Sequence, residues 1–343
     1  HNADVAWGFT NLGPDVADLY LERIEDGAAV VDGEREPLET REETVQVAGG
    51  EPVDITVRST RHGPVLSDAE AALDLRGIGA TPPVDADGEP VGEPVDGAVD
   101  GADEPGEAPD GSGGDAEGAE DGGYAVALSW TALSPGTTAD AIFSMSTASD
   151  FESFRDAARS FEVPAQNLIY ADTSGTIGYQ APGTIPVRGE GDGRWPAPGW
   201  DSSYDWEGFI DFDDLPSVRD PESGVIVTAN QAATGSDYPH LLTEDWDYGY
   251  RAARIHELLQ EEIDAGTELT PEDMVRLQMD TANLGAREVV PHLLEVDLSS
   301  APEDGADPAV ARQLLADWDM DQDADSAAAA FYNAVWSHLL DLT

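Results

Sequence analysis

The charge balance of this chain is the feature that most limits how it can fold. Its 343 residues include 71 Asp and Glu but only 16 basic residues, all of them Arg, so the formal net charge is −55. Acidity of this degree is typical of disordered chains, yet 40% of the residues are hydrophobic, and eight Trp and nine Tyr recur along the chain. We therefore predict a folded core under an acidic surface that repels itself in dilute salt and is screened in concentrated salt.

This composition also limits the partners and the chemistry. The acidic surface indicates a salt-adapted organism and excludes nucleic acid as a partner, because phosphate binding needs a basic face. With no Cys there is no disulfide, thiolate nucleophile or cysteine-ligated zinc, and with no Lys there is no Schiff base or P-loop lysine. No Ser lies in a G-x-S-x-G motif, and we expect the six scattered His to be structural. No apolar run reaches the ~18 residues that a membrane span needs.

Patterns along the chain divide it into four regions. Residues 1–84 carry short apolar runs and two alternating segments around Gly49-Gly50, which predict strands and a hairpin. Residues 85–123 contain 14 acids and no base, and predict an acidic disordered insertion. Residues 124–250 are β-rich again, apart from one helix that Ser149 is expected to cap together with Glu152. Residues 251–343 indicate a helical region that is truncated at its end, so the whole predicts an α+β fold.

Two groups of polar residues are candidates for a site. Asp15 and Asp18 follow a Gly-Pro turn, and carboxylates at this spacing either hold a hard cation or belong to a solvated turn. Asn230 closes a β-branched run at 225–227, which we interpret as a strand. An Asn at a strand end is usually a turn former, and the alternative is an amide donor that points into a site. The acidic repeat at 319–325 is not an EF-hand, because Ala stands where that loop requires Gly and Glu.

A series of short motifs runs through nearly the whole chain outside the acidic insertion. In order they are His1-Asn2, Val5-Ala6-Trp7-Gly8, Thr10-Asn11, Asp15, Asp18-Leu19-Tyr20, Arg61-His62-Gly63-Pro64, Trp130-Thr131-Ala132, Pro164, Gln166-Asn167, Tyr170-Ala171-Asp172, Gly175, Ile177-Gly178-Tyr179, Pro186, Arg188, Pro198-Gly199, Asp205-Trp206, Gly208, Thr228-Ala229-Asn230, Tyr250-Arg251 and Arg254-Ile255. This series resembles the β-chain of the penicillin acylase family. The resemblance implies a four-layer αββα N-terminal-nucleophile hydrolase fold with an additional helical region, of which this chain is an incomplete piece.

The resemblance also implies a mechanism. In this family a Ser that autocatalytic cleavage exposes at the N-terminus of the β-chain forms an acyl-enzyme, and its free α-amine acts as the base. That Ser would lie upstream of His1. The oxyanion is held by a backbone N–H that matches Asn11 and by a side-chain amide that matches Asn230, while Arg251 matches an Arg that supports the amide. The implied substrate is a small N-acyl amide, such as a penicillin or an acyl-homoserine lactone. The implied partner is the α-chain of the same precursor.

A structural calcium site is implied as well. Asp15 and Asp18 match its carboxylate ligands, and Ala17 matches a carbonyl ligand. Gly193 replaces a residue whose carbonyl also binds the ion. One of the acids at 244–245 could replace a further Asp ligand, and the remaining ligand belongs to the α-chain. The rival hypothesis is a non-catalytic, acidic, calcium-binding surface protein on the same fold. In either case we expect a secreted or cell-surface protein.

Overall fold

The structure is a computed structural model that describes residues 1–68, 123–298 and 307–342. Strands dominate its first part and helices its last part, which confirms the α+β prediction. The strands are β1 (Val5–Asn11), β2 (Ala17–Glu25), β3 (Ala28–Val31), β4 (Glu34–Pro37), β5 (Glu39–Val45), β6 (Val53–Thr60), β7 (Gly63–Pro64), β8 (Gly123–Trp130), β9 (Gln166–Asp172), β10 (Ile177–Gln180), β11 (Pro186–Arg188), β12 (Ala197–Pro198), β13 (Trp206–Phe209) and β14 (Ser217–Arg219). The helices are α1 (Thr138–Met145), α2 (Phe151–Ala158), α3 (Tyr250–Asp264), α4 (Pro271–Gln278), α5 (Leu284–Glu295), α6 (Pro308–Ala316) and α7 (Ala327–Asp341).

The acidic insertion predicted for residues 85–123 lies outside the described residues, except for Gly123, with which β8 begins. Across the described residues, no helix is long and apolar enough to cross a membrane.

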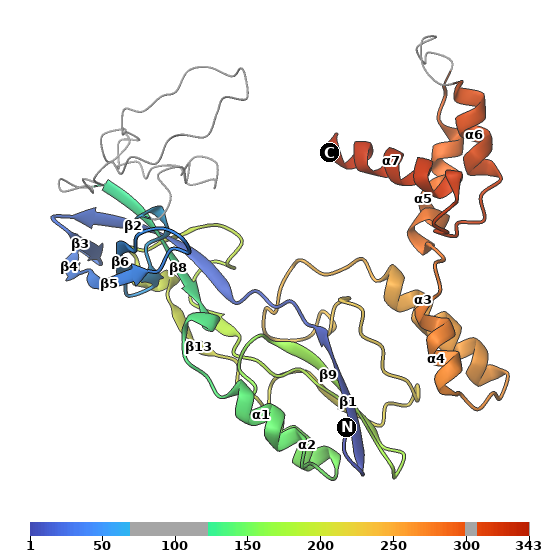
Figure 1. Cartoon of the computed structure of the whole chain (residues 1–343), viewed down its shortest axis with the longest axis horizontal. Coiled ribbons are helices and arrows are strands. Elements are labelled where there is room, and N and C mark those ends of the chain that lie inside the picture. The colour runs from blue at the N-terminus through green and yellow to red at the C-terminus, as the bar shows by residue number, and fades with distance from the viewer. Residues whose placement is uncertain (69–122, 299–306, 343) are drawn as a thin grey trace.

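One antiparallel sheet carries the candidate site. Its strand order is β1-β9-β10-β14, and helices α1 and α2 cover one of its faces (Figure 1). Side chains alternate along β9, so Leu168 and Tyr170 pack under the helices against Phe151 and Phe154. Asn167, the neighbour of Leu168 in sequence, therefore points to the opposite face of the sheet. There it lies opposite Thr10 of β1 in the register of the two strands.

A second apolar cluster forms on the face away from the helices. Its buried members directly follow β1, directly precede β9, belong to β10 or lie between residues 181 and 242; they are Leu12, Ala165, Tyr179, Ala181, Ile185, Ile210, Leu215 and Leu242. Ile226 and Ala233 pack against this cluster. The cluster thus holds the segment around Asn230 close to the end of β1.

A second group of strands is centred on β2. Strand β8 pairs with β2 along its length, from Ala17 opposite Trp130 to Ile24 opposite Gly123. The short β12 pairs with β2 in parallel, and β3 and β4 continue the sheet. The predicted hairpin around Gly49-Gly50 is confirmed as β5–β6. Because β12 pairs with β2, residues near 200 lie beside the strand that carries Asp18.

Five helices, α3 to α7, make up the described last part of the chain. They lead away from the strands in Figure 1, and α5, α6 and α7 share a core that includes Val290, Trp318 and Tyr332. Thr270 caps α4 together with Asp273, and Pro271 is the first residue of the helix. The predicted cap of α2 is wrong by one residue: Asp150 is the N-cap, and its carboxylate accepts a hydrogen bond from Ser153 N at 2.8 Å.

Candidate active site

The three residues predicted for oxyanion stabilisation lie together. Asn230 Nδ2 donates to the backbone carbonyl of Asn11 at 2.8 Å, although 219 positions separate the two residues in sequence. Arg251 Nη2 donates to Asn230 Oδ1 at 2.9 Å. Arginine can only donate and a carbonyl can only accept, so these two partners fix which end of the Asn230 amide faces which way. The second N–H of that amide makes no hydrogen bond within the described residues.

The backbone of Asn230 is in the left-handed region, with a φ of 66°. Among non-glycine residues Asn is one of those that adopt this conformation most readily. Asp247 N donates to the Asn230 carbonyl at 3.0 Å, and Asp247 also pairs with Arg251 at 3.2 Å. Asn230 therefore shapes a turn and presents an amide at the same time. The two alternatives that the sequence left open are not exclusive.

The β-branched run before Asn230 was predicted to be a strand, and this prediction is wrong. No residue from Val225 to Thr228 belongs to a described strand. The side chain of Gln231 takes the place of a neighbouring strand: its Nε2 donates to Val227 O at 2.7 Å and its Oε1 accepts from Ala229 N at 2.7 Å. The side-chain amide thus satisfies backbone groups that would otherwise need a neighbouring strand.

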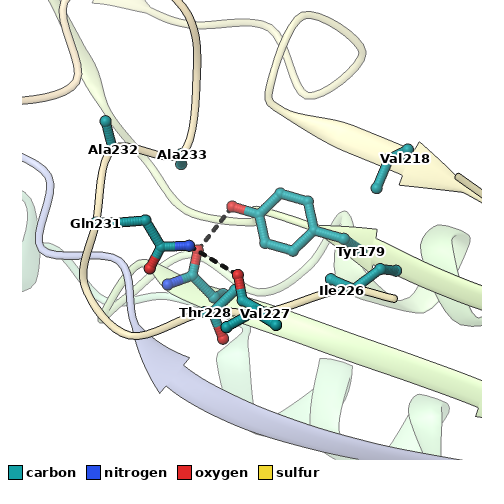
Figure 2. Close-up of a pocket in the computed structure, with 9 residues that line it drawn as sticks. Tyr179, Val218, Ile226, Val227, Thr228, Gln231, Ala232 and Ala233 are labelled. Carbon is teal, nitrogen blue, oxygen red and sulfur yellow. Dashed lines mark hydrogen bonds between the residues drawn. The ribbon is translucent and has the colours of Figure 1, made fainter. Parts of the chain in front are cut away.

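A small cavity lies beside this segment. Its volume is about 170 Å³, and Figure 2 shows most of its lining residues, which are Asn167, Tyr179, Val218, Ile226, Val227, Thr228, Gln231, Ala232 and Ala233. The hydroxyl of Tyr179 donates to Asn167 Oδ1 at 2.7 Å inside it (Figure 2). Burial raises the pKa of Tyr179, so this hydroxyl stays a donor throughout the physiological range. Asn167 and Tyr179 belong to motifs of the sequence series, but the sequence assigned them no role.

The four residues predicted for calcium also come together, but a guanidinium lies among them. Asp18 is 4% exposed, and Arg188 donates to both of its carboxylate oxygens at 2.8 Å. Trp206 Nε1 donates to Asp18 as well. Gly193 lies so close that a Cβ there would be 2.6 Å from Asp18 Oδ1. Ala17 precedes Asp18 at the start of β2. Asp18 thus has its charge balanced and its oxygens occupied by protein donors.

Asp15 is less fully paired. Its carboxylate lies 3.5 Å from Arg188 Nη2. Burial raises the pKa of Asp15; Arg188 opposes this effect, and the nearby Asp18 and Asp245 add to it. Within the described part of the chain, no group of three or more acidic or histidine side chains could hold a metal ion. Asp18 as placed does not fit the role of a calcium ligand, because protein donors already occupy both of its oxygens. Calcium binding itself stays a prediction.

A histidine and two carboxylates form a further group of polar contacts. His62 lies between two carboxylates, with its Nδ1 2.7 Å from Glu22 Oε1 and its Nε2 3.0 Å from Asp205 Oδ1. Its ring stacks on Tyr20 at 3.6 Å between centroids. Glu22 is 0% exposed and also accepts from Thr60 Oγ1. The expectation that His62 is a hydrogen-bonded structural residue agrees with these contacts.

The fold is α+β, and Arg251 and the carbonyl of Asn11 hold the side-chain amide of Asn230 at the end of strand β1. The chain belongs to the penicillin amidase family, whose model matches residues 1–343. It is 33% identical over 261 residues to the acyl-homoserine lactone acylase QuiP of Pseudomonas syringae, a match that covers 75% of this chain and 26% of that protein. It is 31% identical over 342 residues to the penicillin acylase 2 proenzyme of a Pseudomonas species, which covers 97% of this chain and 36% of the proenzyme.

A solved structure agrees with the fold. The thermostable penicillin G acylase from Alcaligenes faecalis superposes with a TM-score of 0.64 at 23% identity, over 95% of this chain and 49% of that one. The chain thus spans between a quarter and two fifths of the length of these curated relatives.

Proposed function

We propose that this chain is part of an amidohydrolase that cleaves a linear amide through a Ser acyl-enzyme, and that Asn230 donates to the oxyanion. The observation that carries the proposal is the Asn230 amide, whose orientation is set by Arg251 on one side and by the Asn11 carbonyl on the other. Family membership supports it. The nucleophile and its amine base would lie in the precursor upstream of His1. The four-layer αββα arrangement and an α-chain partner belong to the same proposal.

The contribution of such a donor is electrostatic. The carbonyl oxygen of the substrate gains negative charge in the tetrahedral state, and a donor already held in place stabilises that charge without reorganising. Removal of one such donor costs about 3–4 kcal/mol in the transition state. The substrate class is an N-acylated small molecule. The names of the relatives, acyl-homoserine lactone acylase and penicillin acylase, support two members of that class.

Replacement of Asn230 in the full-length protein tests the proposal. We expect Asn230→Ala to lower kcat by roughly 10²–10³ with a much smaller change in KM, because the lost hydrogen bond strengthens in the transition state. Asn230→Asp, which places a negative charge toward the oxyanion, should be at least as damaging. Asn333→Ala is the control, because Asn333 bonds to Gln322 on the far helical part of the chain.

The outcomes separate the alternatives. An Asp variant that turns over within a few-fold of wild type would show that Asn230 is not the oxyanion donor. A full-length protein that is not processed to a free N-terminal Ser, and that hydrolyses neither a penicillin nor an acyl-homoserine lactone, would favour the non-catalytic calcium-binding alternative.

A further inference from the structure

The carbonyl of Asn11 receives two side-chain amides. One is Asn230 Nδ2, described above; the other is Asn167 Nδ2, at 3.0 Å. Asn11 is the last residue of β1, so the strand ladder does not continue past it. The position of this carbonyl determines where the Asn230 amide rests. Whatever fixes the end of β1 therefore also fixes the proposed oxyanion donor.

Asn167 is built into the sheet in a single orientation. It is 4% exposed and lies opposite Thr10 in the β1–β9 register. Its Oδ1 accepts from the Tyr179 hydroxyl at 2.7 Å, and its Nδ2 donates to Thr10 Oγ1 at 3.1 Å as well as to Asn11. A flipped amide would place its oxygen against the Asn11 carbonyl, which can only accept, so this carbonyl determines which end of Asn167 faces it. With the amide in that orientation, the Tyr179 hydroxyl donates to its oxygen and holds the side chain in place.

The same network reaches the Asn230 segment by a second route. Thr10 Oγ1 donates to Thr228 Oγ1 at 2.8 Å, two residues before Asn230. The contacts that start at Tyr179 thus join β10, β9 and β1 to the segment that carries Asn230. Tyr179 itself is 6% exposed and packs in the apolar cluster on this face of the sheet.

We infer that Asn167 and Tyr179 are positioning residues for the oxyanion donors: Tyr179 holds the Asn167 side chain in place, and Asn167 holds the Asn11 carbonyl against which Asn230 is set. This inference rests on the proposed function of Asn230. Neither residue needs to touch the substrate, so their effect is expected in kcat and not in KM.

Tyr179→Phe in the full-length protein is the first test, because it removes the hydroxyl and leaves the packing of the ring. We expect kcat to fall about tenfold while KM changes less than about twofold, since one hydrogen bond of the network is lost. The matched control is Tyr170→Phe. Tyr170 is 0% exposed on the adjacent strand, and its hydroxyl donates to Asp172 on the helix-covered side. The control should keep wild-type kcat.

A double-mutant cycle separates positioning from a general loss of stability. If Tyr179 acts through Asn230, then Tyr179→Phe in the Asn230→Ala background should lower kcat by less than about threefold, since the group that it positions is gone. An equal loss of kcat in both backgrounds, or an equal loss in the Tyr170→Phe control, would overturn the inference. If Asn230→Ala loses activity while Tyr179→Phe keeps it, only the positioning role is wrong. If Asn230→Ala keeps activity, the proposed function fails first and the inference fails with it.

Discussion

At the scale of single residues, the candidate site depends on which end of an amide faces which partner. Asn167 and Asn230 direct their N–H groups to the same carbonyl, and each has an oxygen held by a separate donor, Tyr179 or Arg251. Resemblance to a family could place Asn230 and Arg251 in this site from the sequence. It could not reveal the Tyr179–Asn167 link, because that contact depends on the register of β9 and β10.

The calcium prediction also belongs to the residue scale. Arg188 balances one of the two carboxylates, Asp15 and Asp18, so one negative charge of this pair is left over. We therefore expect a bound calcium ion to depend on Asp15. A chelator should lower the melting temperature of the full-length protein. The free energy of unfolding should fall by about 2.7 kcal/mol if free calcium was 100 times its Kd before chelation.

The control for the calcium test is Asp15→Asn, which should melt at the same temperature with and without chelator. If the wild-type melting temperature does not respond to chelator at all, the prediction is wrong, and the Arg188–Asp18 pair alone balances the charge of this cluster.

At the scale of elements, local signals predicted the helices better than the strands. The cap of α4 and the amphipathic run of α7 could be read from neighbouring residues, because a helix is stabilised by contacts within one segment. The strand expected at 225–227 does not form, since a strand needs a partner and the Gln231 side chain supplies those hydrogen bonds instead. Helix α1 was not predicted, because it is one of the shortest helices and buries only Ala141 and Met145, which is too little apolar periodicity to mark a helix.

The contact between α2 and the sheet gives a prediction at this scale. Gly178 of β10 lies under Phe151 of α2, and a Cβ at Gly178 would be 2.3 Å from the ring. Phe151 is only 4% exposed, so its ring has little room to move away. We expect Gly178→Ala to lower the free energy of unfolding by about 1–3 kcal/mol through overpacking.

Gly8→Ala in β1 is the matched control for the glycine test, because a Cβ at Gly8 has no atom within 4 Å. Urea titrations of both variants at constant high salt give the comparison. If both lose the same stability, the cost arises from glycine replacement in a strand and not from the ring of Phe151.

At the scale of the whole molecule, we expect surface charge to set the conditions under which the fold persists. If every one of the 16 Arg paired with an acid, 55 of the 71 acidic residues would still lack a basic partner. Several of the pairs that do form are exposed, such as Arg41 with Glu43 and Arg194 with Asp192. Exposed pairs contribute about 0–1 kcal/mol each and are weakened by salt. The repulsion among the excess carboxylates is weakened by the same salt, and it involves more charges, so its relief should dominate.

We therefore expect the melting temperature of the full-length protein to rise steeply between 0.1 M and 2 M KCl, as the Debye length falls from about 10 Å to below the ~3 Å reached at 1 M. Screening by ions should account for this rise, so an osmolyte such as sorbitol at matched osmolarity should produce much less of it.

Lowering the pH through the carboxylate range in dilute salt should first reduce the repulsion and so raise the melting temperature, as KCl does. The effect should reverse when paired carboxylates, such as Asp280 with Arg254, are protonated too. The pKa of Asp280 is held below its ordinary value by its hydrogen bonds to Arg254, so this second, destabilising step should begin only at lower pH. A melting temperature that is the same at 0.1 M and 2 M KCl would contradict the salt-adapted interpretation, and a rise that sorbitol reproduces would attribute the effect to hydration instead of charge.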